Sequence, residues 1–248
     1  MAIALASATW AQEPPARPAD PPRPPERPAD AGAAPESPAA VPAVDQADRP
    51  GEPPAQAPAP EDDFTYSACL LELRLLGAVF HELPSVADST HTQCGIARPI
   101  RLEQPLPGIE LTGGAMMRCD TARELAHWLR DFVRPAAALR PGQSALVALE
   151  PGTGYQCRQT VGDDGGKLSE HALGNALDIA ALRFEDGSRL EIKPRQDGGD
   201  MDAAFQQAIR ATACLHFTTV LGPGSNAAHD DHLHLDIKSR QGGWRLCQ

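Results

Sequence analysis

The clearest hydrophobic pattern in the chain is helical and begins at Thr121. Thr121 and Glu124 match a capping box, in which a threonine and a glutamate satisfy free amides at the start of a helix. Apolar side chains then recur every three or four residues: Leu125, Trp128, Leu129 and Phe132. This spacing predicts an amphipathic helix that ends at Pro135, because proline lacks an amide donor and clashes with the preceding turn.

Shorter apolar runs predict the remaining elements. A second helix is expected over 202–214, and residues 68–73 suit either a short helix or a strand. Five runs have the composition of strands: 144–149, 176–184, 189–192, 217–221 and 233–237. The second and third of these form a predicted hairpin around Glu185-Asp186-Gly187. Because helices and strands mix without regular alternation, the expected class is α+β, a single domain whose mostly antiparallel sheet is flanked by helices.

Composition separates this domain from the residues before it. Sixteen of the 25 prolines lie in 12–62, a segment too poor in apolar side chains to offset its ordering entropy. We therefore expect a disordered Pro/Ala-rich linker over 12–62 and a folded domain over 63–248. Residues 1–11 are apolar and small, with Thr9 and Ala11 at the −3 and −1 positions of a signal-peptide cleavage site. The alternative for this segment is a frayed apolar N-terminus.

Charge and hydropathy exclude two classes of partner. The chain carries a net charge of −11, most of it in 12–63, so it lacks the basic face that nucleic-acid binding requires. A transmembrane helix needs about 20 consecutive apolar residues, and no stretch of the sequence approaches this length.

The six cysteines all fall within the predicted domain: Cys69, Cys94, Cys119, Cys157, Cys214 and Cys247. None forms a C-x-x-C pair, which argues against a zinc ribbon or a thioredoxin-like site. Their even number and the signal-like segment indicate disulfide bonds in a periplasmic or secreted protein. Six cysteines allow 15 connectivities, and the sequence does not choose among them.

Histidines carry the candidate chemistry. His232 and His234 would share one face of a strand, because side chains alternate with period two. His171 and Asp178 could complete a set of nitrogen and oxygen ligands. A catalytic zinc takes three protein ligands and leaves a fourth position for water, so the pattern predicts one zinc ion.

The segment Ser169–Asp178 resembles the S-x-H-x-x-G-x-A-x-D motif of zinc peptidases that cut D-alanyl bonds and murein cross-links. The His232-x-His234 pair is similar to their second motif. This superfamily includes lysostaphin-like and hedgehog-type domains. The resemblance implies that His171, Asp178 and His234 are the metal ligands.

A closer resemblance is to the bacterial extensin-like C-terminal domain family. The blocks that carry it are 155–158, 169–178, 220–226 and 229–236. It extends over roughly 69–247, nearly the whole predicted domain. It implies a bacterial source.

The resemblance also implies roles for residues around the ligands. His232 would stabilise the tetrahedral intermediate or move a proton, and Arg158 would face the developing oxyanion. The alternatives are a structural histidine and a structural ion pair. Many D-alanyl peptidases place a glutamate base two residues before the last ligand, where this chain has His232, so no general base is assigned.

Three further residues are candidates for supporting the site or contacting substrate. His229 would reach the substrate or a ligand, and Ser169 would hydrogen-bond the loop of the first ligand. Asp236 would accept the N–H of a ligand histidine from the side away from the metal.

Together these features predict a zinc-dependent hydrolase of the cell envelope that cleaves an amide bond in peptidoglycan stem peptides or cross-links. One alternative is a non-catalytic peptidoglycan-binding or structural module, in which His232 or His229 closes the zinc site as a fourth ligand. A third possibility is a periplasmic partner protein that binds through its linker. The sequence does not determine the bond that is cleaved or the oligomeric state.

Overall fold

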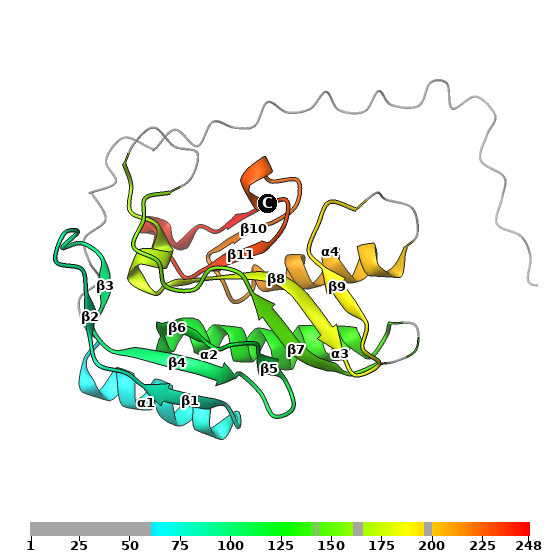
Figure 1. The fold of residues 1–248 in the computed structure, drawn as a ribbon, viewed down its shortest axis with the longest axis horizontal. Coiled ribbons are helices and arrows are strands. Elements are labelled where there is room, and N and C mark those ends of the chain that lie inside the picture. The colour runs from blue at the N-terminus through cyan, green and yellow to red at the C-terminus, as the bar shows by residue number, and fades with distance from the viewer. Residues whose placement is uncertain (1–60, 141, 143, 161–165, 196–199) are drawn as a thin grey trace, which may run out of the picture. The chain divides into compact units, whose positions relative to one another are not determined.

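The computed structural model describes residues 61–140, 142, 144–160, 166–195 and 200–248 (Figure 1). The predicted signal-like segment 1–11 lies outside the described residues. So does the predicted linker 12–62, except for Glu61 and Asp62. Among the described residues, no helix has the length and apolar character needed to cross a membrane.

The domain is α+β, as predicted, and a seven-stranded sheet forms its centre. The strand order is β12-β10-β11-β8-β7-β5, and β9 pairs with β8 outside this path. The strands are β5 (Glu110–Leu111), β7 (Leu146–Pro151), β8 (Ala176–Phe184), β9 (Arg189–Glu191), β10 (Thr219–Leu221), β11 (Leu233–Asp236) and β12 (Leu246–Cys247). All neighbours are antiparallel except β10 with β12 and β5 with β7. The predicted hairpin of 176–184 and 189–192 is confirmed as β8 and β9.

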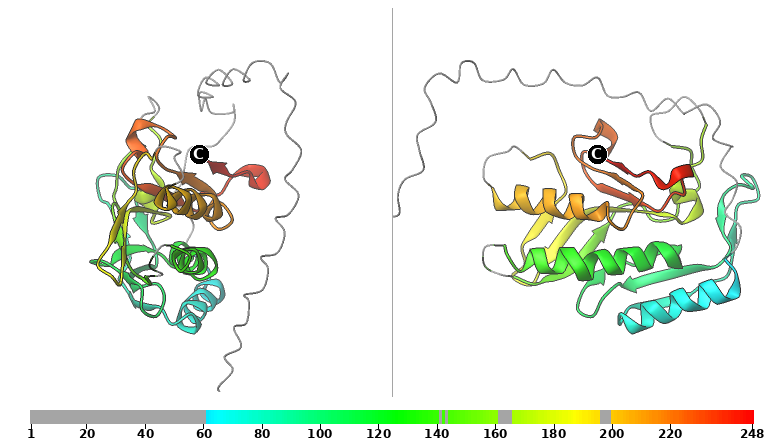
Figure 2. Two further views of the ribbon diagram at one scale, coloured as in Figure 1. Left: turned by 90° about the vertical axis from the view of Figure 1, so that its right-hand side faces the viewer. Right: turned by 180° about the vertical axis from the view of Figure 1, so that it is seen from behind.

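Helices cover one face of this sheet. Figure 2 shows α2 (Cys119–Trp128) and α4 (Met201–Ala213) on the same side of the strands. The predicted helix over 202–214 is α4, and its Phe205 and Ile209 are buried as expected. They share one hydrophobic core with the alternate apolar residues of β8 and β11: Leu177, Ile179, Leu233 and Leu235. The residues between these therefore point to the opposite face of the sheet.

Residues 76–118, for which the sequence predicted no elements, contribute β5 to this sheet and otherwise build two smaller sheets. One has the order β1-β4-β6. Its strands are β1 (Val79–Glu82), β4 (Pro99–Gln104) and β6 (Ala115–Arg118). The other is the hairpin of β2 (Val86–Ala87) and β3 (Gly95–Ile96). Helix α1 (Asp63–Leu75), which includes the ambiguous run 68–73, buries its inner side in the domain core.

A helix does begin near Thr121, as predicted, but the predicted capping box and the predicted stop at Pro135 were wrong. Strand β6 leads directly into α2, so Thr121 lies inside the helix and Arg118 occupies the N-cap without a side-chain hydrogen bond. The Thr121 hydroxyl instead donates to the buried carbonyl oxygen of Gly174, 2.9 Å away. Pro135 does not end the helical run, because a π-helical turn, η1 (Leu129–Val133), precedes it and α3 (Arg134–Ala137) carries it in its first turn, where no amide is needed.

Three disulfides settle the connectivity that the sequence left open: Cys69–Cys119, Cys94–Cys157 and Cys214–Cys247. They join α1 to α2, the β2–β3 hairpin to the segment after β7, and the end of α4 to β12. Their sequence separations of 50, 63 and 33 residues each remove loop-closure entropy from the unfolded chain. In the chain-entropy account, each contributes about 4 kcal/mol to the free energy of unfolding.

Gly174 is the point where three of these substructures meet. Its φ is +69°, and a Cβ atom there would lie 2.3 Å from Ile96 Cδ1 of β3. Its carbonyl oxygen accepts hydrogen bonds from the Thr121 hydroxyl and the Arg118 amide of α2 and β6. This close approach requires a residue without a side chain.

We therefore expect Gly174→Ala to lower the free energy of unfolding by about 2–4 kcal/mol, the sum of left-handed backbone strain and overpacking. Gly187→Ala is the matched control, because Gly187 also has a positive φ (+82°), but a Cβ atom there would meet nothing within 4 Å beyond its own chain neighbours. The control should lose only about 1–2 kcal/mol. Urea unfolding of the oxidised proteins measures both, and equal losses would contradict the packing role of Gly174.

Candidate metal centre

The pairing of β8 with β11 brings two of the predicted ligands together. Asp178 and His234 are opposite one another in this antiparallel ladder, so their side chains lie on the same face. Asp178 Oδ1 is 3.0 Å from His234 Nδ1. This face is the one opposite α2 and α4, because the flanking residues Leu177 and Leu235 belong to the helix-side core.

The third predicted ligand, His171, comes from a short 3-10 helix, η2 (Glu170–Leu173), directly before β8. Ser169 caps this helix and accepts a hydrogen bond from the His171 amide, as its predicted role requires. Gly174 ends it in the left-handed conformation. His171 Nε2 then lies 3.2 Å from both Asp178 Oδ1 and His234 Nδ1.

The three ligand atoms fit a zinc ion. Their separations are 3.0, 3.2 and 3.2 Å. In a tetrahedral site with zinc–nitrogen and zinc–oxygen bonds of about 2.0–2.1 Å, ligand atoms are about 3.3 Å apart. Two imidazoles and one carboxylate are also the donor types that zinc accepts at catalytic centres. Among the described residues, His171, Asp178 and His234 form a compact potential metal-binding group.

Hydrogen bonds fix the tautomer of both histidines. His171 Nδ1 lies 2.8 Å from the Gly154 carbonyl oxygen, and His234 Nε2 lies 3.1 Å from Asp236 Oδ2. Since both partners are acceptors, these nitrogens carry protons. With an ion bound, His171 Nε2 and His234 Nδ1 would therefore present their lone pairs to it; in the metal-free protein His234 Nδ1 carries a proton towards Asp178, because the pKa of His234 is raised to about 9. Asp236 therefore accepts the hydrogen bond from His234 Nε2 that was predicted for it.

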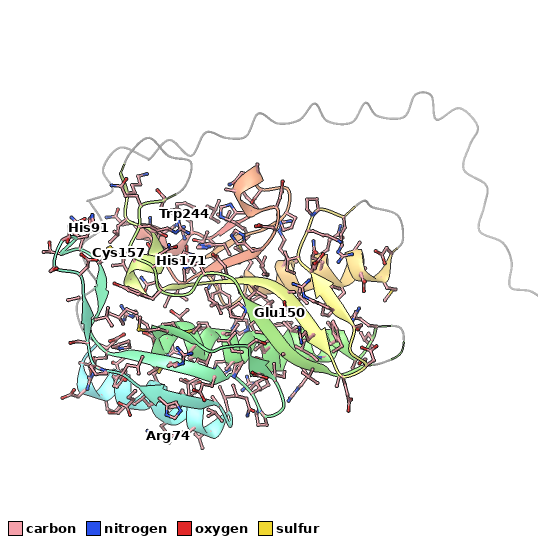
Figure 3. All side chains as sticks on the ribbon, viewed as in Figure 1. Arg74, His91, Glu150, Cys157, His171 and Trp244 are labelled. Atoms are coloured by element: carbon pink, nitrogen blue, oxygen red, sulfur yellow. A yellow bond between two sulfur atoms is a disulfide. The ribbon has the colours of Figure 1, made fainter. Side chains whose placement is uncertain are left out.

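The backbone segment that follows β7 hydrogen-bonds to two of the predicted ligand residues. The Gln156 amide donates to the His171 carbonyl oxygen (3.2 Å), and the Asp178 amide donates to the Thr153 carbonyl oxygen (2.9 Å). Cys157, the next residue in this segment, is bonded to Cys94. Figure 3 shows Cys157 and His171 in this part of the domain. The disulfide thus anchors the backbone segment that orients His171.

Burial and mutual attraction shift the acidities of the group in the metal-free protein. Burial opposes the charge of Asp178, but hydrogen bonds and charges from His171 and His234 outweigh it and hold the pKa of Asp178 well below its usual range. Burial also opposes the charge of His234. Asp178 and Asp236 outweigh it and raise the pKa of His234 to about 9.

His232 and His229 lie at the rim of the group and not within it. His232 precedes β11 by one residue, and its Nε2 is 3.6 Å from Asp178 Oδ1 while its Nδ1 bonds Asp231 (2.8 Å). The His229 ring is centred 5.2 Å from that of His232 and 5.8 Å from that of His234. Burial, followed by the charges of His234 and His232, lowers the pKa of His229 to about 4. Neither histidine joins the compact ligand group of the described residues.

Arg158 lies in the segment that braces His171. Its guanidinium donates to the Gln156 side-chain oxygen (3.1 Å) and to the Gln159 carbonyl oxygen (3.3 Å). After burial and the charges of His234 and His232, the charge of Arg158 also contributes to lowering the pKa of His229. Among the described residues, the two hydrogen-bond contacts of Arg158 pair it with neutral groups.

Sequence reasoning missed one group near the predicted ligands and assigned no role to another. The Gly154 carbonyl gives no side-chain signal, although Gly152 and Gly154 flank Thr153 in a way typical of close backbone approach. Glu170 is buried and accepts a hydrogen bond from the Asn175 side chain (2.7 Å). Burial and the charge of Asp236 raise the pKa of Glu170.

A second cluster of potential ligand types has a different explanation. Asp88, His91 and Cys157 lie close together, but the Cys157 sulfur is in a disulfide. Asp88 accepts hydrogen bonds from the Thr90 and His91 amides, which is the pattern of an Asx turn. We interpret this cluster as a structural turn.

Comparison with known proteins identifies one relationship. A family model described as "Extensin-like protein C-terminus" matches residues 67–248. Neither the curated proteins nor the solved structures gave a match.

The anchoring of the His171 segment leads to a prediction about metal affinity. Replacing both Cys94 and Cys157 by alanine should weaken zinc binding about 10–100-fold, the usual effect of losing support around a metal ligand. The Cys214→Ala/Cys247→Ala variant is the control, because it loses a disulfide at the far edge of the sheet. Chelator competition, at a temperature where both variants are folded, measures the affinities. Equal weakening in both variants would contradict the anchoring role.

The raised pKa of His234 gives a second prediction. At pH 7.5 the metal-free imidazole is protonated, so zinc binding must release about one proton. The protonated His234 ring stabilises the metal-free fold, because the pKa of His234 is higher in the folded than in the unfolded chain. This stabilisation is complete below about pH 6.5 and is lost as the pH rises through about 9. Isothermal titration calorimetry in buffers of different ionisation enthalpy counts the protons. Asp236→Asn should release fewer, and no release from the parent protein would contradict the protonated state.

Proposed function

This chain belongs to the extensin-like protein C-terminus family, and we propose that it is a zinc-dependent hydrolase that cleaves an amide bond in peptidoglycan peptides or cross-links. The observation that carries the proposal is the triangle of His171 Nε2, Asp178 Oδ1 and His234 Nδ1. Both remaining histidine nitrogens in this triangle donate to fixed acceptors. A zinc site with three protein ligands leaves a fourth coordination position for water or substrate.

The resemblance to zinc peptidases supports the same assignment. Residues that match the two peptidase motifs, 169–178 and 232–234, come from separate parts of the chain and meet in one place. The position that holds a glutamate base in many D-alanyl peptidases is occupied by His232. This substitution favours the murein endopeptidase type.

The protein residues supply binding, orientation and proton transfer. His171, Asp178 and His234 would hold the ion, and zinc bound there would polarise a carbonyl group and acidify water. The Nδ1 atom of His232 is bonded to Asp231, and its Nε2 atom lies 3.6 Å from Asp178, beyond hydrogen-bond distance, so Nε2 can take and return a proton. In hydrolysis His232 takes a proton from the attacking water and delivers it to the leaving amine as the C–N bond breaks.

Arg158 and His229 complete the proposed site. Arg158 supplies the fixed cation that stabilises negative charge on the carbonyl oxygen in the transition state. Arg158 is held by Gln156 and Gln159, which lie in the segment that also braces His171. His229 is neutral at physiological pH because its pKa is lowered to about 4, and it is therefore suited to contact substrate by hydrogen bonding.

The compartment is part of the proposal. Three disulfides fit an oxidising environment, so we place the protein in the periplasm or outside the cell, where peptidoglycan is its substrate. The rim of the site offers both charges, with Arg158 on one loop and Asp231 beside His232. A peptidoglycan stem peptide carries both carboxylates and amines.

The test has two stages and uses the oxidised full chain. Native mass spectrometry should show one zinc ion per chain, and none in His171→Ala, Asp178→Ala or His234→Ala. His91→Ala is the control, since His91 is an exposed histidine outside the ligand triangle. A parent protein that binds no zinc would refute the metal site.

The second stage screens zinc-loaded protein against purified muropeptide monomers and cross-linked dimers by mass spectrometry. The parent should produce fragments that have gained one water, and His232→Gln should keep its zinc and lose about 10²–10⁴ in rate. Bound zinc without cleavage of any muropeptide would refute the hydrolase and favour a non-catalytic peptidoglycan-binding module.

A further inference from the structure

Helix α1 carries apolar side chains on two opposite faces. The inner face packs into the core through Tyr66, Cys69, Leu70 and Leu73. The outer face carries Phe64, Ala68, Leu71 and Leu75. Of these, Phe64 is 83% exposed, Leu71 55% and Leu75 79%. A surface helix normally places charged or polar residues on such a face, so this stripe (Phe64, Ala68, Leu71 and Leu75) needs an explanation.

The stripe has the spacing of a helix–helix seam. Its intervals of four, three and four residues are those of the a and d positions in a coiled coil. Figures 1 and 2 show α1 at the margin of the described domain, with its outer side away from the sheets and from α2. The stripe is therefore accessible to another helix.

The positions of the stripe are symmetric about the midpoint between Cys69 and Leu70. If a second copy of α1 lies antiparallel across it, Phe64 faces the second copy's Leu75, and Ala68 faces the second copy's Leu71. Each contact then occurs twice, which is the condition for a two-fold interface. The small Ala68 side chains near the centre allow the helices to approach closely.

Charges at the ends of α1 favour the antiparallel arrangement. Asp62 and Asp63 lie at its N-terminus, and Arg74 lies in its last turn. The Asp63 side chain is 94% exposed and the Arg74 side chain 60% exposed, although they also contact Arg98 and Glu82 respectively. Antiparallel helices place the acids of one copy near the Arg74 of the other and oppose the two helix dipoles. Parallel helices would place like charges together.

Residues that flank the stripe are compatible with this orientation. In an antiparallel seam Ser67 faces the second copy's Arg74, and Thr65 faces the second copy's Glu72. Neither pair brings like charges together. From the symmetric stripe and these charges, we propose that the outer face of α1 is the interface through which two copies of the protein associate. This interface is independent of the proposed catalytic site.

The dimer is expected to be weak and reversible, because one helix of 13 residues is only about 20 Å long. Analytical ultracentrifugation of the oxidised full chain should show dimer formation as the concentration rises from about 1 to 500 μM, the range in which weak complexes form. Leu71→Glu should abolish the dimer. Leu139→Glu, a change at an exposed leucine (78%) outside α1, should leave it unchanged.

A second variant tests the orientation. Ser67→Glu adds an attraction to the second copy's Arg74 in the antiparallel seam and should tighten the dimer several-fold, as expected for an exposed ion pair. In a parallel seam it would face the second copy's Glu72 and weaken the dimer. A parent protein that stays monomeric over the whole range would overturn the proposal, as would a dimer unaffected by Leu71→Glu. A monomer that binds phospholipid vesicles through this stripe would also overturn it, in favour of a lipid surface.

Discussion

The register between β8 and β11 determines both the core and the candidate metal centre. With Asp178 opposite His234, the adjacent residues Leu177 and Leu235 are buried against α2 and α4. A slip of one residue would turn the ligands towards the helices and expose the leucines to the opposite face, at a cost of several buried apolar side chains. Core packing thus holds Asp178 and His234 in position on these two strands.

The strand register does not position His171, because η2 is a single helical turn that lies outside the β8–β11 ladder. His171 is held instead by contacts from distant parts of the chain. The Gly154 carbonyl fixes the ring of His171, and α2 and β6 bond the carbonyl of Gly174 just after η2. The Cys94–Cys157 disulfide ties the bracing segment to the β2–β3 hairpin. The β2–β3 hairpin, the end of β6 and the start of α2 therefore all help to position one histidine.

This difference explains how far the sequence could predict the structure. Long periodic elements such as α4 and the β8–β9 hairpin have local signals, and the structure confirms them. The proposed ligand set followed from motif resemblance. The strands between residues 79 and 118 are two to six residues long and form through distant pairing, so periodicity could not reveal them. The capping box at Thr121 failed because its hydroxyl bonds a carbonyl 53 residues away, a contact that local sequence cannot encode. Disulfide pairing and the Gly154 carbonyl depend on the same tertiary arrangement.

Electrostatics make the centre suitable for a metal ion. Asp178 and Asp236 are both nearly fully buried, and burying two carboxylates is costly unless positive charge compensates them. In the metal-free protein that compensation comes from His234, whose ring lies between the two carboxylates and whose pKa is raised accordingly. A divalent cation at the ligand triangle would take over this role on the Asp178 side and leave His234 bonded to Asp236 through Nε2. The buried carboxylates that destabilise the metal-free fold would therefore increase its affinity for the ion. Metal binding at this site is expected to stabilise the folded state.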